Sequence, residues 1–208
     1  MATASKRAVM TLYSSPRCPY CHRVRMVLKE KGIPAEVLEL DAQNPGPELL
    51  ELNPYGTVPT LADRDLTLYE SRIIMEYLDE RFPHPPLMPI DPVGRANIRL
   101  FLYRVDRDWF SRLETIAGGG KSAAKARKEL QESLLGAARL FAAKPFFLND
   151  EITLVDCAIA PLLWRLPRLG VEIPSQAKSI HDYARRIFAR PGFRASLSDL
   201  EKEMREYP

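Results

Sequence analysis

The sequence predicts a small α/β domain followed by an all-α domain. Three observations predict this class: strand-like and helix-like patterns alternate over the first eighty residues, prolines cluster between residues 83 and 89, and no strand-like pattern follows Asp91-Pro92. We therefore expect an α/β domain over residues 1–82, a proline-rich linker over 83–91 and an all-helical domain over 92–208.

The first domain is predicted to build a mixed sheet with helices. A short apolar run before Ser14-Ser15-Pro16 predicts a strand, and apolar residues at positions 24, 27 and 28 share one helical face before Gly32. Apolar runs on either side of residues 63–65 predict a hairpin, and Ser71 is expected to cap the next helix. In chain order we expect a strand over 9–13, a helix over 20–31, a strand over 36–40, a turn at 44–47, a helical piece over 48–52, strands over 58–61 and 66–69, and a helix over 71–81.

Helical patterns fill the chain after the linker. Three prolines within residues 83–86 stop the preceding helix and favour extended backbone. Gly118-Gly119-Gly120 separates the first two helices of the second domain, and Lys144-Pro145 ends the second of them. The expected helices lie at about 92–117, 122–143, 153–170 and 178–190, with a polar tail helix near 194–206.

Composition and charge exclude several classes of protein. The 208 residues are 46% hydrophobic and 27% charged, which is typical of a globular protein that buries its own core. A net charge of +3 does not indicate a nucleic-acid binder, and no apolar run is long enough for a transmembrane helix. The polar start, Met1 to Arg7, lacks the apolar segment of a signal peptide, so we expect a cytoplasmic protein.

A C-x-x-C motif, Cys18 to Cys21, lies between the first predicted strand and helix. Free N–H groups at a helix N-terminus stabilise a thiolate, so we expect a lowered pKa for Cys18, to which Arg17, Arg23 and Arg25 would add if they face it. Cys21, one turn further on, would be a more buried resolving thiol. Two interpretations stay open: a nucleophilic Cys18 that forms mixed disulfides or a bridge to Cys21, or two partly buried thiols without turnover. Because no second Cys or His pair at ligand spacing occurs, we expect no metal site.

Two further segments are candidates for ligand binding. Val58-Pro59 is a candidate cis-proline turn, in which the Val58 backbone would pair with an extended peptide; the alternative is an ordinary trans proline that enters an edge strand. Glu70-Ser71 opens a helix, where a hydroxyl and free amides suit a carboxylate and Glu70 suits an ammonium, as in a γ-glutamyl group. The alternative is that Ser71 only caps the helix and Glu70 only complements its dipole.

The linker segment Phe82-Pro83-His84-Pro85 is the third candidate. A Pro-His-Pro loop is stiff, and two interpretations fit it: a preformed docking site with Phe82 and the prolines exposed, or a hinge that fixes the orientation of the domains. The remaining chemistry-bearing residues are assigned no site: His22 and His181 lack nearby partners in the sequence, and Cys157, Trp109 and Trp164 lie on apolar helical faces.

This order of motifs resembles the glutathione S-transferase fold, a thioredoxin-like domain with a mixed sheet followed by a helical bundle. The resemblance covers nearly the whole chain and includes the C-x-x-C helix, the segment from Asn53 to Pro59, the hairpin and the Glu70-Ser71 helix. It implies that a glutathione site would comprise Cys18, the Val58 backbone before Pro59, Glu70 and Ser71.

Two longer stretches resemble the stringent starvation protein A family, bacterial regulators associated with RNA polymerase and built on this fold. They run from Glu70 to Pro89 and from Leu154 to Pro167. The resemblance implies a homodimer that binds RNA polymerase holoenzyme and alters transcription during starvation and stress, with the Phe82-Pro83-His84-Pro85 loop as its docking surface. Members of the family generally lack glutathione transferase activity, so the resemblance implies no required cofactor, with glutathione as a possible ligand. From the net charge of +3 and the lack of a long apolar run we expect no membrane partner and no requirement for direct contact with nucleic acid.

The chain departs from the family in one respect. Some members have no cysteine in the first-helix motif, whereas Cys18 and Cys21 are both present here and resemble the motif of glutaredoxins and of omega-class transferases. A second function therefore stays open, a glutathione-dependent thiol transferase with Cys18 as nucleophile and glutathione as its cofactor. A third interpretation combines the two, with the polymerase contact controlled by oxidation of Cys18.

Overall fold

The computed structural model describes residues 9–41 and 44–205. The polar stretch from Met1 to Arg7, on which the expectation of a cytoplasmic location rests, lies outside the described residues, as does the last residue of the predicted tail helix. Among the described residues, no helix combines the length and the apolar character needed to cross a membrane.

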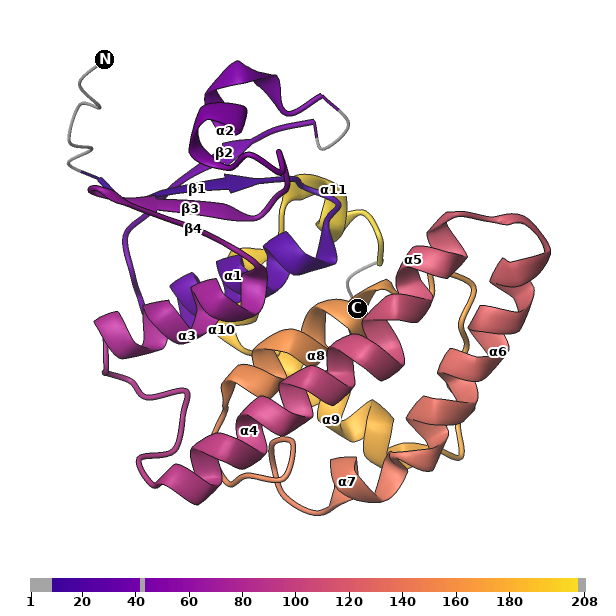
Figure 1. Ribbon diagram of the computed structural model, residues 1–208. Coiled ribbons are helices and arrows are strands. Elements are labelled where there is room, and N and C mark those ends of the chain that lie inside the picture. The colour runs from indigo at the N-terminus through magenta and orange to yellow at the C-terminus, as the bar shows by residue number, and fades with distance from the viewer. Residues whose placement is uncertain (1–8, 42–43, 206–208) are drawn as a thin grey trace.

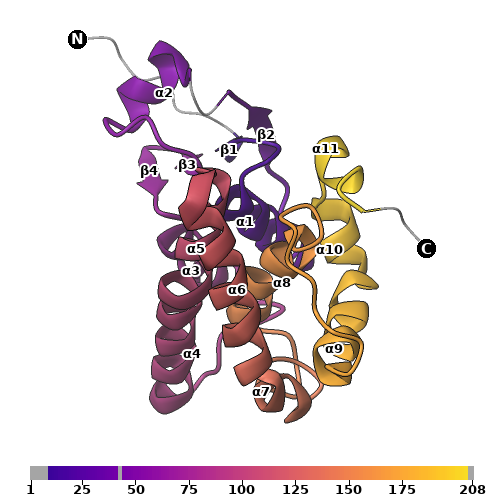
Figure 2. The same ribbon diagram turned by 90° about the vertical axis from the view of Figure 1, so that its right-hand side faces the viewer.

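A four-stranded mixed sheet forms one end of the molecule (Figures 1 and 2). The strands are β1 (Thr11–Ser14), β2 (Glu36–Glu39), β3 (Thr60–Asp63) and β4 (Leu66–Tyr69), in the spatial order β2-β1-β3-β4. β2 is parallel to β1, while β3 is antiparallel to both β1 and β4. The sheet therefore has the mixed character that the strand and helix order predicts.

Helices cover both faces of the sheet. Because side chains alternate along a strand, neighbouring residues contact the helices on opposite faces. Leu12 and Leu61 join the main core, towards α1 (Pro19–Glu30) and α3 (Ser71–Arg81). Their neighbours Tyr13 and Ala62 point to the other face and pack around Leu49 of α2 (Gly46–Leu52). Figure 1 shows α2 on one side of the sheet and α1 with α3 on the other.

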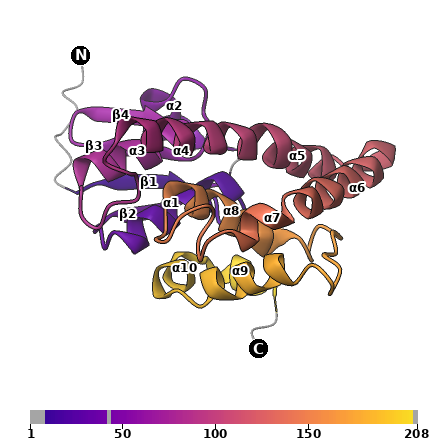
Figure 3. The ribbon, with the colours of Figure 1, turned by 90° about the horizontal axis from the view of Figure 1, so that it is seen from below.

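The helical part is built around α8 (Leu154–Arg165), all of whose residues are buried. A capping box of Thr153 and Asp156 opens this helix, as the Thr-x-x-Asp pattern indicates. The long helix α4 (Pro92–Val105) packs on one side of α8 and α9 (Lys178–Phe188) on the other (Figure 3). The other helices of this part are α5 (Ser111–Ala117), α6 (Gly120–Gly136), α7 (Ala138–Ala142), α10 (Pro191–Ser196) and α11 (Asp199–Lys202).

Several predicted boundaries are wrong for identifiable reasons. The expected helix over 92–117 is interrupted by η1 (Asp106–Phe110), one turn of π-helix, which leaves no mark in the apolar periodicity. The helix expected over 153–170 ends at Arg165, ahead of Pro167, which lacks a backbone N–H. The predicted tail helix is two short helices, and the helix after the turn at 44–47 already begins at Gly46.

Residues 83–86 of the linker are exposed, whereas the two residues that follow anchor the linker to the rest of the molecule. Leu87 and Met88 are buried, and the Leu87 carbonyl accepts a hydrogen bond of 2.9 Å from the N–H of Leu154 in α8. The Leu87 N–H in turn donates to the Asp79 carboxylate of α3 at 2.8 Å. These contacts fix the chain where it passes from the α/β part to the helical part.

Candidate functional site

The register of the sheet brings three predicted site segments to one edge. Tyr13, near the end of β1, pairs with Thr60 at the start of β3, and Thr60 pairs with Tyr69 at the end of β4. The C-x-x-C motif follows β1, Val58-Pro59 precedes β3, and Glu70-Ser71 follows β4. The topology therefore gathers all three segments, although Cys18 and Ser71 lie 53 positions apart in the sequence.

Cys18 is the N-cap residue of α1, as the motif predicts. Its pKa falls from 9.0 to about 6. The Cys21 thiol makes the largest contribution by hydrogen bonding to Cys18, and burial opposes it. The backbone N–H groups of Cys21 and Tyr20 and the charge of Arg165 lower the pKa further. Near neutral pH the side chain is therefore mainly a thiolate.

Cys21 has the opposite character. It is completely buried inside the first turn of α1, and its sulfur accepts a hydrogen bond of 3.3 Å from the Ser15 N–H. Burial raises the pKa of Cys21 well above 9.0, and the nearby Cys18 raises it further. The expected division between an acidic thiol and a more deeply buried, protonated one is thus present, and both cysteines are free.

Two of the three basic residues expected to assist Cys18 are engaged elsewhere, while Arg17 lines the pocket beside it. Arg23 binds the Ser71 hydroxyl and the Asp106 carboxylate, and Arg25 binds Glu201 of α11 at 2.5 Å. The cation that acts on Cys18 is Arg165, from the end of α8. Nothing in the sequence near Cys18 indicates this residue; the only signal is a charged residue at the end of an otherwise apolar helix.

Arg165 belongs to a buried polar cluster beneath Cys18. Its guanidinium pairs with Glu201, donates to the Arg17 carbonyl at 3.3 Å and donates to His22 Nδ1 at 2.9 Å. Because Nδ1 accepts from an arginine, the proton of this neutral imidazole is on Nε2, which lies 3.0 Å from the Ser196 hydroxyl. Burial lowers the pKa of His22 well below 6.5, and the two arginines beside it act in the same direction. His22, to which the sequence assigns no role, thus joins α1 to the C-terminal helices.

The other two segments retain free backbone groups. The Val58–Pro59 peptide bond is cis, and no backbone hydrogen bond to Val58 occurs among the described residues. Glu70 is exposed, has a φ of 69° and is itself the N-cap residue of α3. Ser71 therefore does not cap the helix, contrary to expectation, because it is the first helical residue.

The Ser71 hydroxyl accepts a hydrogen bond of 2.8 Å from Arg23 Nε. As an acceptor from arginine it keeps its own proton for a ligand, and the buried guanidinium places a positive charge behind it. A carboxylate at the N-terminus of α3 would therefore meet an O–H donor, free N–H groups and this charge.

A pocket of about 290 Å³ opens beside Cys18. Its walls come from the N-terminus of α1, from Leu113 and Ala117 of α5, and from Arg165 and Leu169. The Tyr20 hydroxyl donates to Glu114 at 2.8 Å across its margin, and burial raises the pKa of this phenol. Tyr20 therefore stays protonated and is no candidate for a base.

The linker loop is a separate candidate surface. Pro83, His84 and Pro85 are exposed, whereas Phe82 is only half-exposed and packs against the core, which corrects the expectation that it is exposed with the prolines. The His84–Pro85 peptide bond is cis. The Lys31 ammonium donates to the Pro85 carbonyl at 2.5 Å and to Asp79 at 2.7 Å, so a buried ion pair holds the base of the loop.

The described part of the chain, residues 9–41 and 44–205, brings no three His, Cys, Asp or Glu side chains together in a way that would hold a metal ion. The chemistry that these residues offer is that of a thiolate, an anion-binding helix end and an exposed proline loop.

Comparison with known proteins gives consistent matches along the chain. The model of the glutathione S-transferase N-terminal domain matches residues 12–86, and that of the glutathione S-transferase C-terminal domain matches residues 95–191. A stringent starvation protein A homolog of Coxiella burnetii is 52% identical, with 97% of both chains covered. A homolog of the same name from Haemophilus influenzae is 52% identical over 95% of this chain and 94% of that one.

Among solved structures, glutathione transferase Omega 3C from Trametes versicolor superposes with a TM-score of 0.82. It is 26% identical and the match covers 93% of this chain and 86% of that one.

Proposed function

The chain belongs to the stringent starvation protein A family within the glutathione S-transferase superfamily, and from this premise we propose that it is an RNA polymerase-associated regulator of transcription. The predicted fold class is confirmed by the two matching domain models, the mixed sheet and the helical C-terminal part. The proposed regulator is cytoplasmic, acts as a homodimer in starvation and stress, and requires neither cofactor nor metal.

The proposed docking surface is the linker loop, and its exposure on an anchored backbone is the observation that carries the proposal. His84 and the adjoining prolines are exposed, yet their backbone is held from below by Lys31, and Leu87 and Met88 anchor the chain that follows. A surface fixed before binding loses little conformational freedom when a partner binds. Such anchors also suit a hinge that fixes the orientation of the domains; the exposure of His84 and the adjoining prolines is what favours docking.

Exposed apolar residues extend this surface. Ile90 is 96% exposed and Val93 is 71% exposed, directly after the loop in the chain. Apolar side chains next to a rigid turn suit the centre of a protein–protein contact, with charged residues at its rim. The proposed contact surface therefore comprises the exposed residues 83–86 together with Ile90 and Val93.

A pull-down with purified RNA polymerase holoenzyme tests this proposal. We expect wild-type protein to retain the polymerase, and His84→Ala and Pro85→Ala to reduce its recovery. His181→Ala and Pro174→Ala are matched controls, since the His181 ring contacts the Pro174 carbonyl at 3.1 Å on the helical part. Equal recovery by all five proteins would contradict docking through the loop.

A second function is supported by the acidity of Cys18. With a pKa of about 6, its thiolate would attack the glutathionyl sulfur of a mixed disulfide, forming a Cys18–glutathione disulfide and releasing the other thiol. A second glutathione thiolate would then attack this disulfide, giving oxidised glutathione and restoring the Cys18 thiolate. The Val58 backbone before Pro59, with Glu70 and Ser71, would hold the tripeptide, and Cys21 would act as a resolving thiol.

The thiol-transferase assay separates the two functions. We expect Cys18→Ser to remove any turnover of a glutathione mixed disulfide while leaving recovery of polymerase unchanged. Turnover that persists in Cys18→Ser would contradict Cys18 as the nucleophile.

A further inference from the structure

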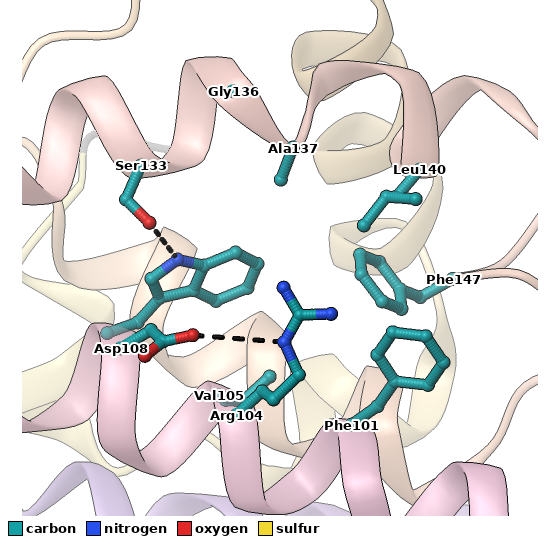
Figure 4. Close-up of a pocket in the computed structure, with 10 residues that line it drawn as sticks. Phe101, Arg104, Val105, Asp108, Ser133, Gly136, Ala137, Leu140 and Phe147 are labelled. Carbon is teal, nitrogen blue, oxygen red and sulfur yellow. Dashed lines mark hydrogen bonds and ion pairs between the residues drawn. The ribbon is translucent and has the colours of Figure 1, made fainter.

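A second pocket, outside the site described above, lies between α4, η1, α6 and α7. Its cavity volume is about 160 Å³. Phe101, Trp109 and Phe147 form an aromatic floor, with edge-to-face contacts at centroid distances of 5.7 and 6.4 Å (Figure 4). A cavity of roughly 150 Å³ with apolar walls accepts one benzene ring, so this space suits a single ring or a branched alkyl group.

The walls of this pocket are fixed. The π turn η1 supplies Trp109, whose indole Nε1–H donates to the Ser133 hydroxyl of α6 at 2.9 Å. Single π turns within α-helices are frequent at functional sites. Because the Ser133 oxygen accepts this hydrogen bond and donates none within the described residues, its own proton remains available to a ligand.

Two oppositely charged side chains, those of Arg104 and Asp108, lie beside the aromatic floor of the pocket. Arg104 and Asp108 lie one helical turn apart, and both side chains line the pocket (Figure 4). Arg104 Nε is 3.9 Å from the Asp108 carboxylate, too long for a hydrogen bond, so each group keeps most of its capacity for a ligand. The Arg104 guanidinium also lies 5.9 Å from the centre of the Phe101 ring.

We propose that this pocket binds a free α-amino acid with an apolar or single-ring side chain. The side chain lies on the aromatic floor, the α-carboxylate accepts hydrogen bonds from Arg104, and the α-ammonium pairs with Asp108. A simple carboxylate would meet the Asp108 charge and a simple amine the Arg104 charge, whereas a zwitterion is complementary to both.

Titration by nuclear magnetic resonance with L-phenylalanine and L-leucine tests the proposal. The chain has two tryptophans, and the indole N–H signal that moves in Ser133→Ala identifies Trp109. We expect saturable shifts of this signal with a dissociation constant of about 1 mM for a ligand of this size. Phenylacetate, phenethylamine and N-acetyl-L-phenylalaninamide, each lacking one or both charges, are expected to bind at least about threefold more weakly.

Variants test the assigned contacts. Arg104→Gln and Asp108→Asn are each expected to weaken binding at least about threefold. Arg185→Gln and Asp182→Asn break a similar exposed pair of 3.0 Å on α9, which contributes no residue to this pocket, and are expected to have no effect. Ala137 points into the cavity, so Ala137→Leu is expected to fill it and abolish binding in a protein of unchanged thermal stability (Figure 4).

Absence of a saturable shift at the Trp109 indole would overturn the proposal. So would equal affinity for N-acetyl-L-phenylalaninamide, which would assign the pocket to an aromatic side chain of a protein partner instead.

Discussion

Cys18 and Cys21 are three positions apart, yet their thiols experience opposite environments. Cys18 lies at the N-terminus of α1. There the Cys21 thiol, the N–H groups of Tyr20 and Cys21, and the charge of Arg165 stabilise its thiolate. Cys21 is completely buried one turn later, and burial disfavours its anion. A single helical turn therefore separates an acidic thiol from a thiol that stays protonated.

The rate at which Cys18 is alkylated should depend on pH with a midpoint of about 6. Its pKa is lowered, so the reactive thiolate dominates above this midpoint and is lost as the pH falls through it; an ordinary thiol would show the same loss near 9.0. Alkylation by iodoacetamide, followed by mass spectrometry of the Cys18 peptide, measures the profile.

Removing the main source of this acidity should move the midpoint. In Cys21→Ala the thiol that donates to Cys18 is lost, so the midpoint should rise towards 9.0. Cys157→Ala, in the core of α8, is the matched control and should leave it unchanged. A midpoint that stays near 6 in Cys21→Ala would assign the acidity to the helix terminus and Arg165 alone.

Among the described residues, Glu201 is the only one whose carboxylate pairs with both Arg25 and Arg165. Both arginines are buried, so Glu201→Gln leaves two positive charges facing each other without a counter-ion. Loss of one member of such a buried group costs about 3–5 kcal/mol of the free energy of unfolding.

Urea denaturation measures this cost, with the exposed neighbour Glu203→Gln as control. A difference below about 1 kcal/mol between the two variants would show that the cluster is not an obligatory ion group.

At the scale of elements, the linker loop depends on a buried ion pair beneath it. Lys31 of the α1 C-cap and Asp79 of α3 are both buried and 2.7 Å apart, and both bind the backbone of the loop. In Asp79→Asn the Lys31 charge loses its partner, so we expect about 3–5 kcal/mol of destabilisation.

The same variant should expose the loop backbone. Hydrogen exchange is expected to accelerate at Leu87 and Met88 in Asp79→Asn, but not in Glu80→Gln, which affects only exposed pairs with Arg95 and Arg99. Unchanged exchange would show that Leu87 and Met88 hold the loop by packing alone.

The sequence predicts those elements whose signals are local. The face formed by Val24, Val27 and Leu28, the stop at Gly32 and the Thr153-Asp156 capping box all lie where expected. The π turn at Asp106–Phe110 is missed because one extra residue per turn alters no local propensity. Ser71 is misassigned as a cap because Glu70, with a φ of 69°, takes the N-cap position and the helix starts at Ser71.

The residues of the candidate site likewise fall into those that the sequence predicts and those that it misses. Cys18 at a helix N-terminus and the edge shared with Val58-Pro59 follow from motif order and sheet topology. Arg165 and Glu201 are missed because they lie far along the chain and only tertiary packing brings them to Cys18. Long-range charge pairs of this kind leave no pattern in a single sequence.

At the scale of the whole molecule, α1 joins the two parts. Arg23 ties it to α3 and η1, while His22 and Arg25 tie it to α8, α10 and α11. A change at the Cys18 end of α1 would therefore act on contacts to both parts of the chain.

The proposed homodimer suits the outer face of α3 and α4. Ile73, Leu100 and Tyr103 are 54%, 53% and 47% exposed on these helices, which the ion pair Arg99–Glu76 holds side by side. We expect sedimentation analysis to give a dimer, and Leu100→Glu with Ile73→Glu to give a monomer because two charges would be buried.

Ile90→Glu is the control for this experiment. Ile90 is more exposed than either residue but lies in the linker. A dimer that survives the double substitution would place the interface elsewhere.

Co-elution with RNA polymerase holoenzyme in size-exclusion chromatography, combined with a thiol-transferase assay on the same fractions, tests the central claim most directly. We expect the wild-type chain and Cys18→Ser to co-elute with the polymerase, and His84→Ala to elute alone with its fold intact. The claim that the linker loop binds the polymerase would be contradicted if His84→Ala and Pro85→Ala co-eluted with it as fully as the wild-type protein.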